Sequence, residues 1–318
     1  ENPIDAYAAL FRGAFDGELR LGTTLAGFTP LLLTSIAFAV AAKAGAFNVG
    51  VEGEVFLGGI TAAYIGINWT FLPKPALYVA CFVGAMVVAA AWAFIPAILR
   101  AYYNVNEVCT TILMNTVALY ITSYLVSGPM SAGTANAQSL PVTVRLYQFM
   151  KPSSVNVGIF IAAITVIVII FMLQKSSWGY KIRTVGLNPT HADYVGIDSK
   201  KVFVGAMMLS GMLGGMAGCI EVLGVHGYFL NNFATGLGSN GMLAALIVKN
   251  NMVSTPFMAF FLAVLKSGAM GMQQSTGVPK SLVDTITAVF IIIATMETAF
   301  QFTKKRKKKT EEKKEDKA

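Results

Sequence analysis

The stretch AFNVGVEGEVFLGG, Ala46 to Gly59, interrupts a chain that otherwise consists largely of apolar membrane segments. Two carboxylates, Glu52 and Glu54, and one amide, Asn48, stand there among glycines and apolar residues. An ionisable group at the centre of a membrane helix costs about 2.5 to 3.5 kcal/mol on insertion scales, so acids in this place are candidates for function. Glycines suit a chain that unwinds and starts a new helix while exposing backbone groups. The stretch therefore predicts a broken membrane helix with polar groups at the break.

The composition of the whole chain indicates a membrane protein. Of its 318 residues, 55% are hydrophobic and only 13% are charged, which excludes an ordinary soluble domain. Runs long enough to cross roughly 30 Å of hydrocarbon, at about 20 residues each, recur along the sequence without the alternation typical of a β-barrel. We therefore expect an all-α, polytopic helical fold. The nine candidate spans are centred on residues 24–42, 54–69, 76–99, 108–127, 155–174, 202–223, 237–249, 253–273 and 282–302.

The second and seventh candidate spans are short and rich in glycine, so each is a candidate for a half-crossing. In both halves of the chain a long apolar helix precedes such a short segment, and an acid lies in each region. Inverted repeats with interrupted helices build the central site of many transporters, and the pattern fits such a repeat. Close packing of glycine-rich helices is the alternative explanation.

Basic residues set the orientation. The loop 174–201 and the tail 304–318 are the two densest basic segments, and the positive-inside rule places both in the cytoplasm. The tail carries nine basic residues and is expected to be disordered, and the permease domain before it covers residues 1–303. No folded basic domain accompanies the tail, so nucleic-acid binding is disfavoured. Alternation gives the other connections: 128–156 and 68–75 outside, 100–107 and Lys43 inside. It also leaves the N-terminus outside without a preceding span, so we expect a further N-terminal crossing helix in the native chain.

Residues with the chemistry of catalysis or metal binding are sparse. The cysteines Cys81, Cys109 and Cys219 share no close spacing, and the two histidines, His191 and His226, are far apart, so neither a disulfide framework nor a His-rich metal site is expected. No phosphate-binding G-x-x-x-x-G-K-[ST] loop and no Ser, His and Asp set is present. The chain is therefore expected not to be an enzyme and to bind no cofactor itself, with ATP and magnesium bound by another subunit if ATP is used.

Seven residues are candidates for a substrate pathway. An amide, a carboxylate and an aromatic ring together would suit a nucleobase or a sugar. For each acid the alternative is structural, such as a carboxylate near a helix start that is favoured by the helix dipole. The candidates are Phe47, Asn48, Glu52, Glu54, Asn115, Glu221 and Asn240.

The inner loop, about residues 176–200, is long. Asn188 and Pro189 break the backbone, and THADYVGI can form a short helix across the membrane face. A helix presented to the cytoplasm favours a protein partner, and a merely solvated loop is the alternative.

Four motifs resemble one transporter family. The stretches AFNVGVEGEVFLGG, NEVCTTILMN, GYKIRTVGLNPTHADYVGI and GMLGGMAGCIEVLGVHGYF with GLGSNGMLAALI are similar to the membrane permeases of ABC importers for nucleosides, within the wider group for simple sugars and branched-chain amino acids. The likeness extends over nearly the whole chain. The first motif is the most specific, because sugar permeases of the group carry a different sequence there. The chain departs from the usual pattern at Glu54, where the family mostly has glutamine, which puts a charge beside the proposed site.

The resemblance implies a ten-helix permease in the cytoplasmic membrane of a bacterium, with about nine spans in this chain. It implies that residues 186–197 form the coupling helix seated on a cytoplasmic ABC ATPase, with Gly186, Asn188, Pro189, Asp193 and Gly196 as its coupling residues. The implied partners are that ATPase, a second related permease in a heterodimer and an extracellular substrate-binding lipoprotein. The basic tail by itself predicts a contact with anionic membrane lipid.

Alternatives remain for the function. A permease for sugars or branched-chain amino acids would share the architecture. A passive channel working alone would need no ATPase-docking helix. An intramembrane enzyme would need paired groups at one depth, for which Glu52 and Glu221 are the only plausible pair.

Overall fold

The computed structural model of this protein describes residues 3–276 together with residues 281 and 285. In this part of the chain the regular structure is helical, and β-structure is limited to isolated bridges. The elements are α1 (Pro3–Phe15), α2 (Gly17–Lys43), α3 (Val51–Asn68), α4 (Lys74–Tyr103), α5 (Glu107–Ser127), α6 (Gly158–Lys175), α7 (Ser177–Leu187), α8 (Pro189–Tyr194), α9 (Ser199–Ile220), the π-helix η1 (Glu221–His226), α10 (Leu237–Ile247) and α11 (Thr255–Thr276).

The predicted all-α polytopic fold is confirmed. Six elements in the described part are long and apolar enough to cross a membrane: α2, α4, α5, α6, α9 with η1, and α11. The two predicted short segments correspond to α3, with 18 residues, and α10, with 11 residues. The ninth candidate span, 282–302, and the tail 304–318 lie outside the described residues, apart from the single residue 285.

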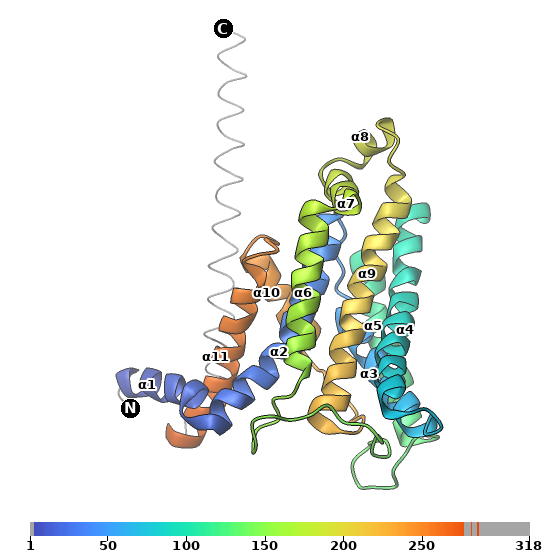
Figure 1. The fold of residues 1–318 in the computed structure, drawn as a ribbon. Helices are drawn as coiled ribbons and strands as arrows, with labels where there is room; N and C mark the ends of the chain where they lie inside the picture. The colour runs from blue at the N-terminus through green and yellow to red at the C-terminus, as the bar shows by residue number, and fades with distance from the viewer. Residues whose placement is uncertain (1–2, 277–280, 282–284, 286–318) are drawn as a thin grey trace.

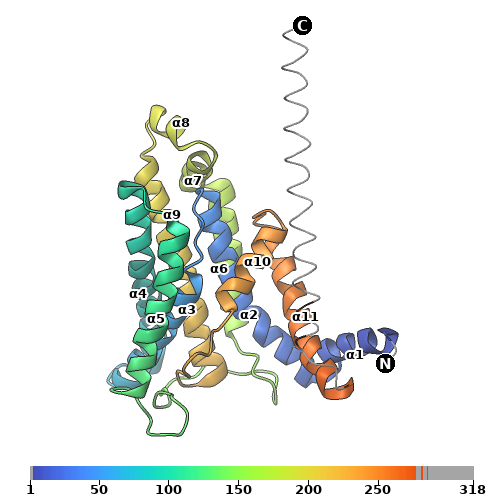
Figure 2. The same cartoon turned by 180° about the vertical axis from the view of Figure 1, so that it is seen from behind.

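The connections alternate between the two ends of the bundle as the sequence predicts. Figure 1 shows α7 and α8 at one end and the long connection 128–157 at the opposite end. The turn between α4 and α5 lies at the α8 end, and the turn between α3 and α4 lies at the other (Figures 1 and 2). Helix α1 lies across the end opposite α8, where Leu10 packs with Ala269 and Met272 of α11.

Two non-helical segments lead the chain back into the bundle. Residues 44–50 leave the end of α2 and descend to the start of α3, and residues 227–236 return from η1 to the start of α10 (Figures 1 and 2). Helices α3 and α10 then run in opposite directions from starting points inside the bundle. This pair of interrupted elements is the arrangement that an inverted repeat with broken helices would produce.

The starts of α3 and α10 are in direct contact. A Cβ atom at Gly238 would lie 2.6 Å from the Glu52 amide nitrogen and 2.8 Å from its Cβ. Only glycine therefore allows this approach without displacing a helix. The contact fixes the two breaks against each other.

Small residues of α9 form the centre of the packing. A Cβ atom at Gly211 would lie 2.7 Å from the Ala89 carbonyl oxygen of α4, and one at Gly218 would clash with the Val55 carbonyl of α3. Close approach of backbones through small residues is how membrane helices gain packing contact without a hydrophobic driving force. For the glycines of α9, close packing is thus the role that the structure shows.

Candidate functional site: a cavity beside the broken helices

A cavity of about 360 Å³ lies between α2, η1, α10 and α11. Its wall is mostly apolar, with Pro30, Leu31, Leu243 and Met270 among the lining residues. The polar lining comprises Thr23, Ser154, Glu221, His226, Thr235, Asn240, Lys266 and Ser267. An apolar concavity with a few convergent polar groups is the usual form of a site for a small organic molecule.

The π-helix η1 positions the acid of this cavity. Its hydrogen bonds run between residues five apart, which brings Glu221 and His226 to one face, with 3.6 Å between Glu221 Oε2 and His226 Nε2. The Lys266 side chain of α11 interacts electrostatically with Glu221 across the cavity wall. A carboxylate, an imidazole and an ammonium thus converge from two helices.

An aromatic cluster adjoins these polar groups. Phe233 contacts His226 edge to face, with ring centroids 5.8 Å apart, and packs in the same manner on Phe56 and Phe229 at 5.7 and 5.2 Å. Both His226 and Phe233 line the cavity. The wall therefore offers flat apolar rings next to hydrogen-bonding groups.

The opening motif forms a separate buried cluster. Asn48 Nδ2 donates to Glu54 Oε1 and to Ser210 Oγ, both at 2.9 Å, and Asn48 Oδ1 accepts from the Gly50 N–H at 2.9 Å. Asn48 and Glu54 are each about 1% exposed, and Glu54 Oε2 has no hydrogen-bond partner among the described residues. In this conformation the two side chains join the break after α2 to α9.

Asn115 of α5 holds the same break from the other side. Its Oδ1 accepts from the Gly53 N–H at 2.8 Å, and its Nδ2 donates to the Val49 carbonyl at 2.9 Å. The Gly53 N–H lies in the first turn of α3, where an N–H has no intrahelical partner, and the Val49 carbonyl belongs to the non-helical segment before α3. The amide therefore supplies the bonds that the break removes.

Glu52 lies between two helix starts. It occupies the first turn of α3, and Ser239 Oγ of α10 donates to its Oε2 at 3.4 Å. Each helix N-terminus carries a partial positive charge, so a carboxylate between two of them is favoured. Phe47 lies nearby in sequence, is 36% exposed, and packs edge to face on Phe38 at 5.0 Å.

The structure thus brings only two of the seven predicted pathway residues, Glu221 and Asn240, to the cavity. The other five lie outside its lining, and their part in a substrate pathway stays a prediction. Sequence reasoning did not assign His226, Phe233 or Lys266 to a site. The sequence signals that could have found two of them are Lys266, which lies inside an apolar run, and His226, which follows Glu221 by five residues.

The segment α7–α8 projects from one end of the bundle (Figure 1). Asn188 caps α8, its Oδ1 accepting from the His191 N–H at 3.0 Å, with Pro189 at the first helical position. Asp193 accepts from the Ser199 N–H and Oγ, both at 2.9 Å. Asp193 therefore attaches α8 to the first turn of α9.

Two glycines complete this segment. Gly196 has a φ of +80°, which favours glycine, and a Cβ atom at Gly186 would clash with the Lys43 carbonyl at the end of α2. All five predicted coupling residues thus lie in one projecting unit. Leu187 and Tyr194, 88% and 86% exposed, present apolar surface on it.

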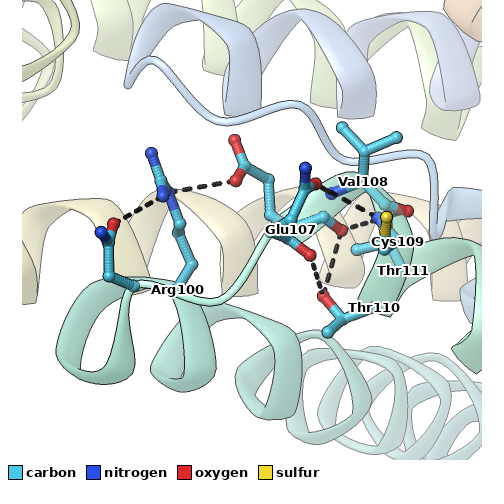
Figure 3. Close-up of polar contacts among 8 residues, drawn as sticks. Arg100, Glu107, Val108, Cys109, Thr110 and Thr111 are labelled. Carbon is cyan, nitrogen blue, oxygen red and sulfur yellow. Dashed lines mark hydrogen bonds and ion pairs between the residues drawn. The ribbon is translucent and has the colours of Figure 1, made fainter.

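The turn between α4 and α5 lies at the same end and is held by polar contacts (Figure 3). Arg100 Nε is 3.0 Å from Glu107 Oε2, and Arg100 Nη1 donates to Asn104 Oδ1 at 2.7 Å. Asn106 caps α5 by accepting from the Val108 N–H at 2.9 Å. Glu107 thus pairs with a cation at a helix start, which is a structural role.

Comparison with known proteins assigns the family. Residues 20–295 match the family described as branched-chain amino acid transport system / permease component. The chain belongs to this permease family. The predicted resemblance is thereby confirmed, and the permease is a multi-pass membrane protein.

Several curated relatives of this permease match nearly its whole length. The guanosine ABC transporter permease protein of Bacillus subtilis is 33% identical over 95% of this chain and 88% of the relative. The nucleoside ABC transporter permease protein of Lactococcus lactis is 31% identical over 91% of this chain and 83% of the relative. The glucose ABC transporter permease protein of Haloferax volcanii is 32% identical over 92% and 80%. No solved structure matches the permease.

Proposed function

We propose that this permease is the membrane-spanning subunit of an ATP-driven importer that moves nucleosides across the cytoplasmic membrane of a bacterium. Two of its relatives at 31 to 33% identity are named for guanosine or nucleoside transport. The observation that carries the proposal is the cavity in which Glu221, His226 and Lys266 adjoin Phe233. A nucleoside combines a flat base, polar base edges and ribose hydroxyls, and this wall offers a partner for each.

The chemistry of binding follows from the wall. The base would pack against Phe233 or His226, because offset and edge-to-face contacts between rings are favourable. The Glu221 carboxylate is an acceptor for base N–H groups or ribose hydroxyls, and the Asn240 amide is both donor and acceptor. Each hydrogen bond to a charged group would contribute about 1.5 to 3 kcal/mol.

The path from ATP hydrolysis to the cavity would run through α9. In our proposal a cytoplasmic ABC ATPase, which holds ATP and magnesium, docks on the α7–α8 segment at the exposed Leu187 of α7 and Tyr194 of α8. Asp193 fixes α8 to Ser199, and α9 continues from there into η1, whose Glu221 lines the cavity. A displacement of α8 would therefore move one wall of the solute cavity, as alternating access requires.

Further subunits belong to this proposal. A substrate-binding lipoprotein would deliver solute at the end formed by the 128–157 connection, and a second related permease would complete the membrane part. A sugar permease is the second candidate, favoured by the 32% identity to the glucose permease. A sugar has no aromatic base, but the C–H face of its ring would also pack on the phenylalanine and histidine rings, so the uptake test separates the two candidates.

The test is uptake of radiolabelled guanosine, adenosine, ribose, glucose and leucine by cells that express the full transporter. We expect nucleoside uptake that stops on ATP depletion and is lost in Glu221→Gln and Asn240→Ala at normal expression. Glu18→Gln removes an exposed acid in the first turn of α2 that does not line the cavity, and should transport normally. Uptake of glucose or leucine instead of nucleosides would refute the substrate, and uptake indifferent to ATP would indicate a passive channel.

A further inference from the structure

A second cavity, of about 210 Å³, lies at the end of the bundle that carries α7 and α8. It is lined by Lys43, Leu173, Gln174, Arg183, Asn251 and Met252. These residues come from the end of α2, the end of α6, α7 and the connection between α10 and α11. Two of the six are cations and none is an acid. The cavity is therefore basic and is built from four separate parts of the chain.

Among the described residues, neither Lys43 nor Arg183 has a carboxylate within 4.0 Å, because the ion pairs found there join other side chains. The Arg183 guanidinium reaches only the Gln174 carbonyl oxygen, at 3.4 Å. Lys43 and Arg183 are both partly buried. The carbonyls at the ends of α2 and α6 supply only partial negative charge. Two partly desolvated cations without a full counter-charge favour an anionic ligand.

The lipid-facing side of α6 leads to this cavity. Phe160, Ile164, Ile167 and Phe171 recur at helical spacing and are 57 to 66% exposed, as expected for a surface against acyl chains. Gln174, which lines the cavity, lies three residues after Phe171 and is therefore its neighbour on the helix surface. A lipid whose chains lie along α6 would thus have its headgroup beside Lys43 and Arg183.

We propose that this basic cavity binds the phosphate of an anionic phospholipid headgroup. The positive-inside rule places this end at the cytoplasmic leaflet, whose anionic lipids attract basic groups. Basic cavities between membrane helices on this side are a known form of headgroup site. A bound headgroup would connect α2, α7 and the α10–α11 connection, and so steady the base of the projecting α7–α8 segment.

The experiment uses the complete purified transporter that contains the full chain. Native mass spectrometry counts retained phosphatidylglycerol and phosphatidylethanolamine, and thermal unfolding is followed with each lipid and with inorganic phosphate. The Lys43→Gln/Arg183→Gln variant should bind phosphatidylglycerol about thirty-fold more weakly, since each basic residue near an anionic surface contributes about fivefold. The matched Lys175→Gln/Lys181→Gln variant removes two exposed lysines of the same face that do not line the cavity, and should bind normally.

Three outcomes would overturn the proposal. Equal phosphatidylglycerol binding by wild type and Lys43→Gln/Arg183→Gln would show that this cavity is not a lipid site. An equal loss in Lys175→Gln/Lys181→Gln would show a general attraction to the basic face. Stabilisation by inorganic phosphate without lipid retention would assign the cavity to a free phosphate. The charge-conserving Lys43→Arg/Arg183→Lys variant separates loss of charge from misfolding, because it should retain the lipid.

Discussion

Glu54 is a buried acid that pairs, among the described residues, with the amide of Asn48 and with no cation. A charge in such a place is costly, and a neutral acceptor would serve the hydrogen bond equally well. At the scale of single residues, Glu54 is thus needed as the hydrogen-bond acceptor for Asn48, whereas its negative charge is dispensable.

Glu54→Gln is therefore expected to unfold at the same temperature as the wild type or higher, because the acceptor for Asn48 remains and the charge is removed. Glu54→Ala should lower the free energy of unfolding by about 1 to 3 kcal/mol, since it leaves a buried amide donor unpaired. Thermal unfolding in detergent measures both. A Glu54→Gln protein less stable than wild type by more than the error would mean that the charge itself is needed.

Asn115→Ala should also destabilise the protein, by about 1 to 3 kcal/mol, because the Gly53 N–H and the Val49 carbonyl both lose their partner. The control is Asn68→Ala. Asn68 is exposed and donates only to the Tyr64 carbonyl of its own helix. Equal unfolding temperatures for the two variants would contradict the role assigned to Asn115.

At the scale of elements, much of the helical layout could be predicted from the sequence. Eight of the nine apolar runs correspond to described helices; six of these runs are long, and the two short, glycine-rich ones correspond to α3 and α10. The cavity could not be predicted. It depends on the π-helical turn that brings Glu221 to His226 and on the approach of Lys266 from another helix. Likewise, Ser210 lies 162 residues from Asn48, and no local pattern announces their contact.

The contact between α3 and α10 predicts the effect of one methyl group. In Gly238→Ala the new Cβ would lie 2.6 Å from the Glu52 nitrogen, so one helix must move. We expect a loss of about 1 to 3 kcal/mol of stability, as for overpacked sites, and impaired uptake. Gly27→Ala in α2, where a Cβ meets nothing within 4 Å, should unfold at the temperature of the wild type or higher, and it serves as a control for stability only, because Gly27 lines the solute cavity. Normal stability of Gly238→Ala would show that the helix starts are not tightly packed.

The start of α9 predicts a pH effect. Asp198 caps α9, and the hydrogen bond from the Lys201 N–H, followed by the contact with the Lys201 ammonium, lowers the pKa of its carboxyl below the ordinary value. A lowered pKa in the folded state contributes stability that is complete above the ordinary pKa of about 3.9 and is lost as the pH falls through the folded value. The free energies of unfolding of the wild type and of Asp198→Asn should therefore differ most above pH 5 and become equal at acidic pH. A constant difference between pH 3 and pH 7 would contradict this linkage.

At the scale of the whole molecule, one continuous route joins the projecting segment to the cavity. Asp193 connects α8 to Ser199, and α9 leads from there to Glu221. In Figures 1 and 2 the projecting segment and the end of η1 lie at opposite ends of the bundle. A rigid helix is the simplest element that can transmit a displacement over this distance.

Asp193→Ala should consequently reduce solute uptake at least about tenfold, because loss of hydrogen bonds to a charged group costs about 1.5 to 3 kcal/mol and frees α8 from α9. ATP hydrolysis by the assembled transporter should continue without uptake. Thr190→Ala, an exposed change on the same helix, is the control. Loss of both hydrolysis and assembly in Asp193→Ala would mean that the residue holds the subunits together and does not transmit motion.

The length of α10 has a consequence for the biosynthesis of the protein. Its 11 residues extend about 16 Å, roughly half the hydrocarbon thickness of a bilayer. A segment this short cannot remain across the membrane by itself, and the non-helical residues 227–236 before it would expose backbone groups to lipid. Helix α10 is sheltered only once α2, α3 and α11 surround it, and residues 227–236 are sheltered by backbone hydrogen bonds to the 128–157 connection. Insertion of this part of the chain must therefore follow the placement of helices made earlier and later, so the order of synthesis is not the order of assembly.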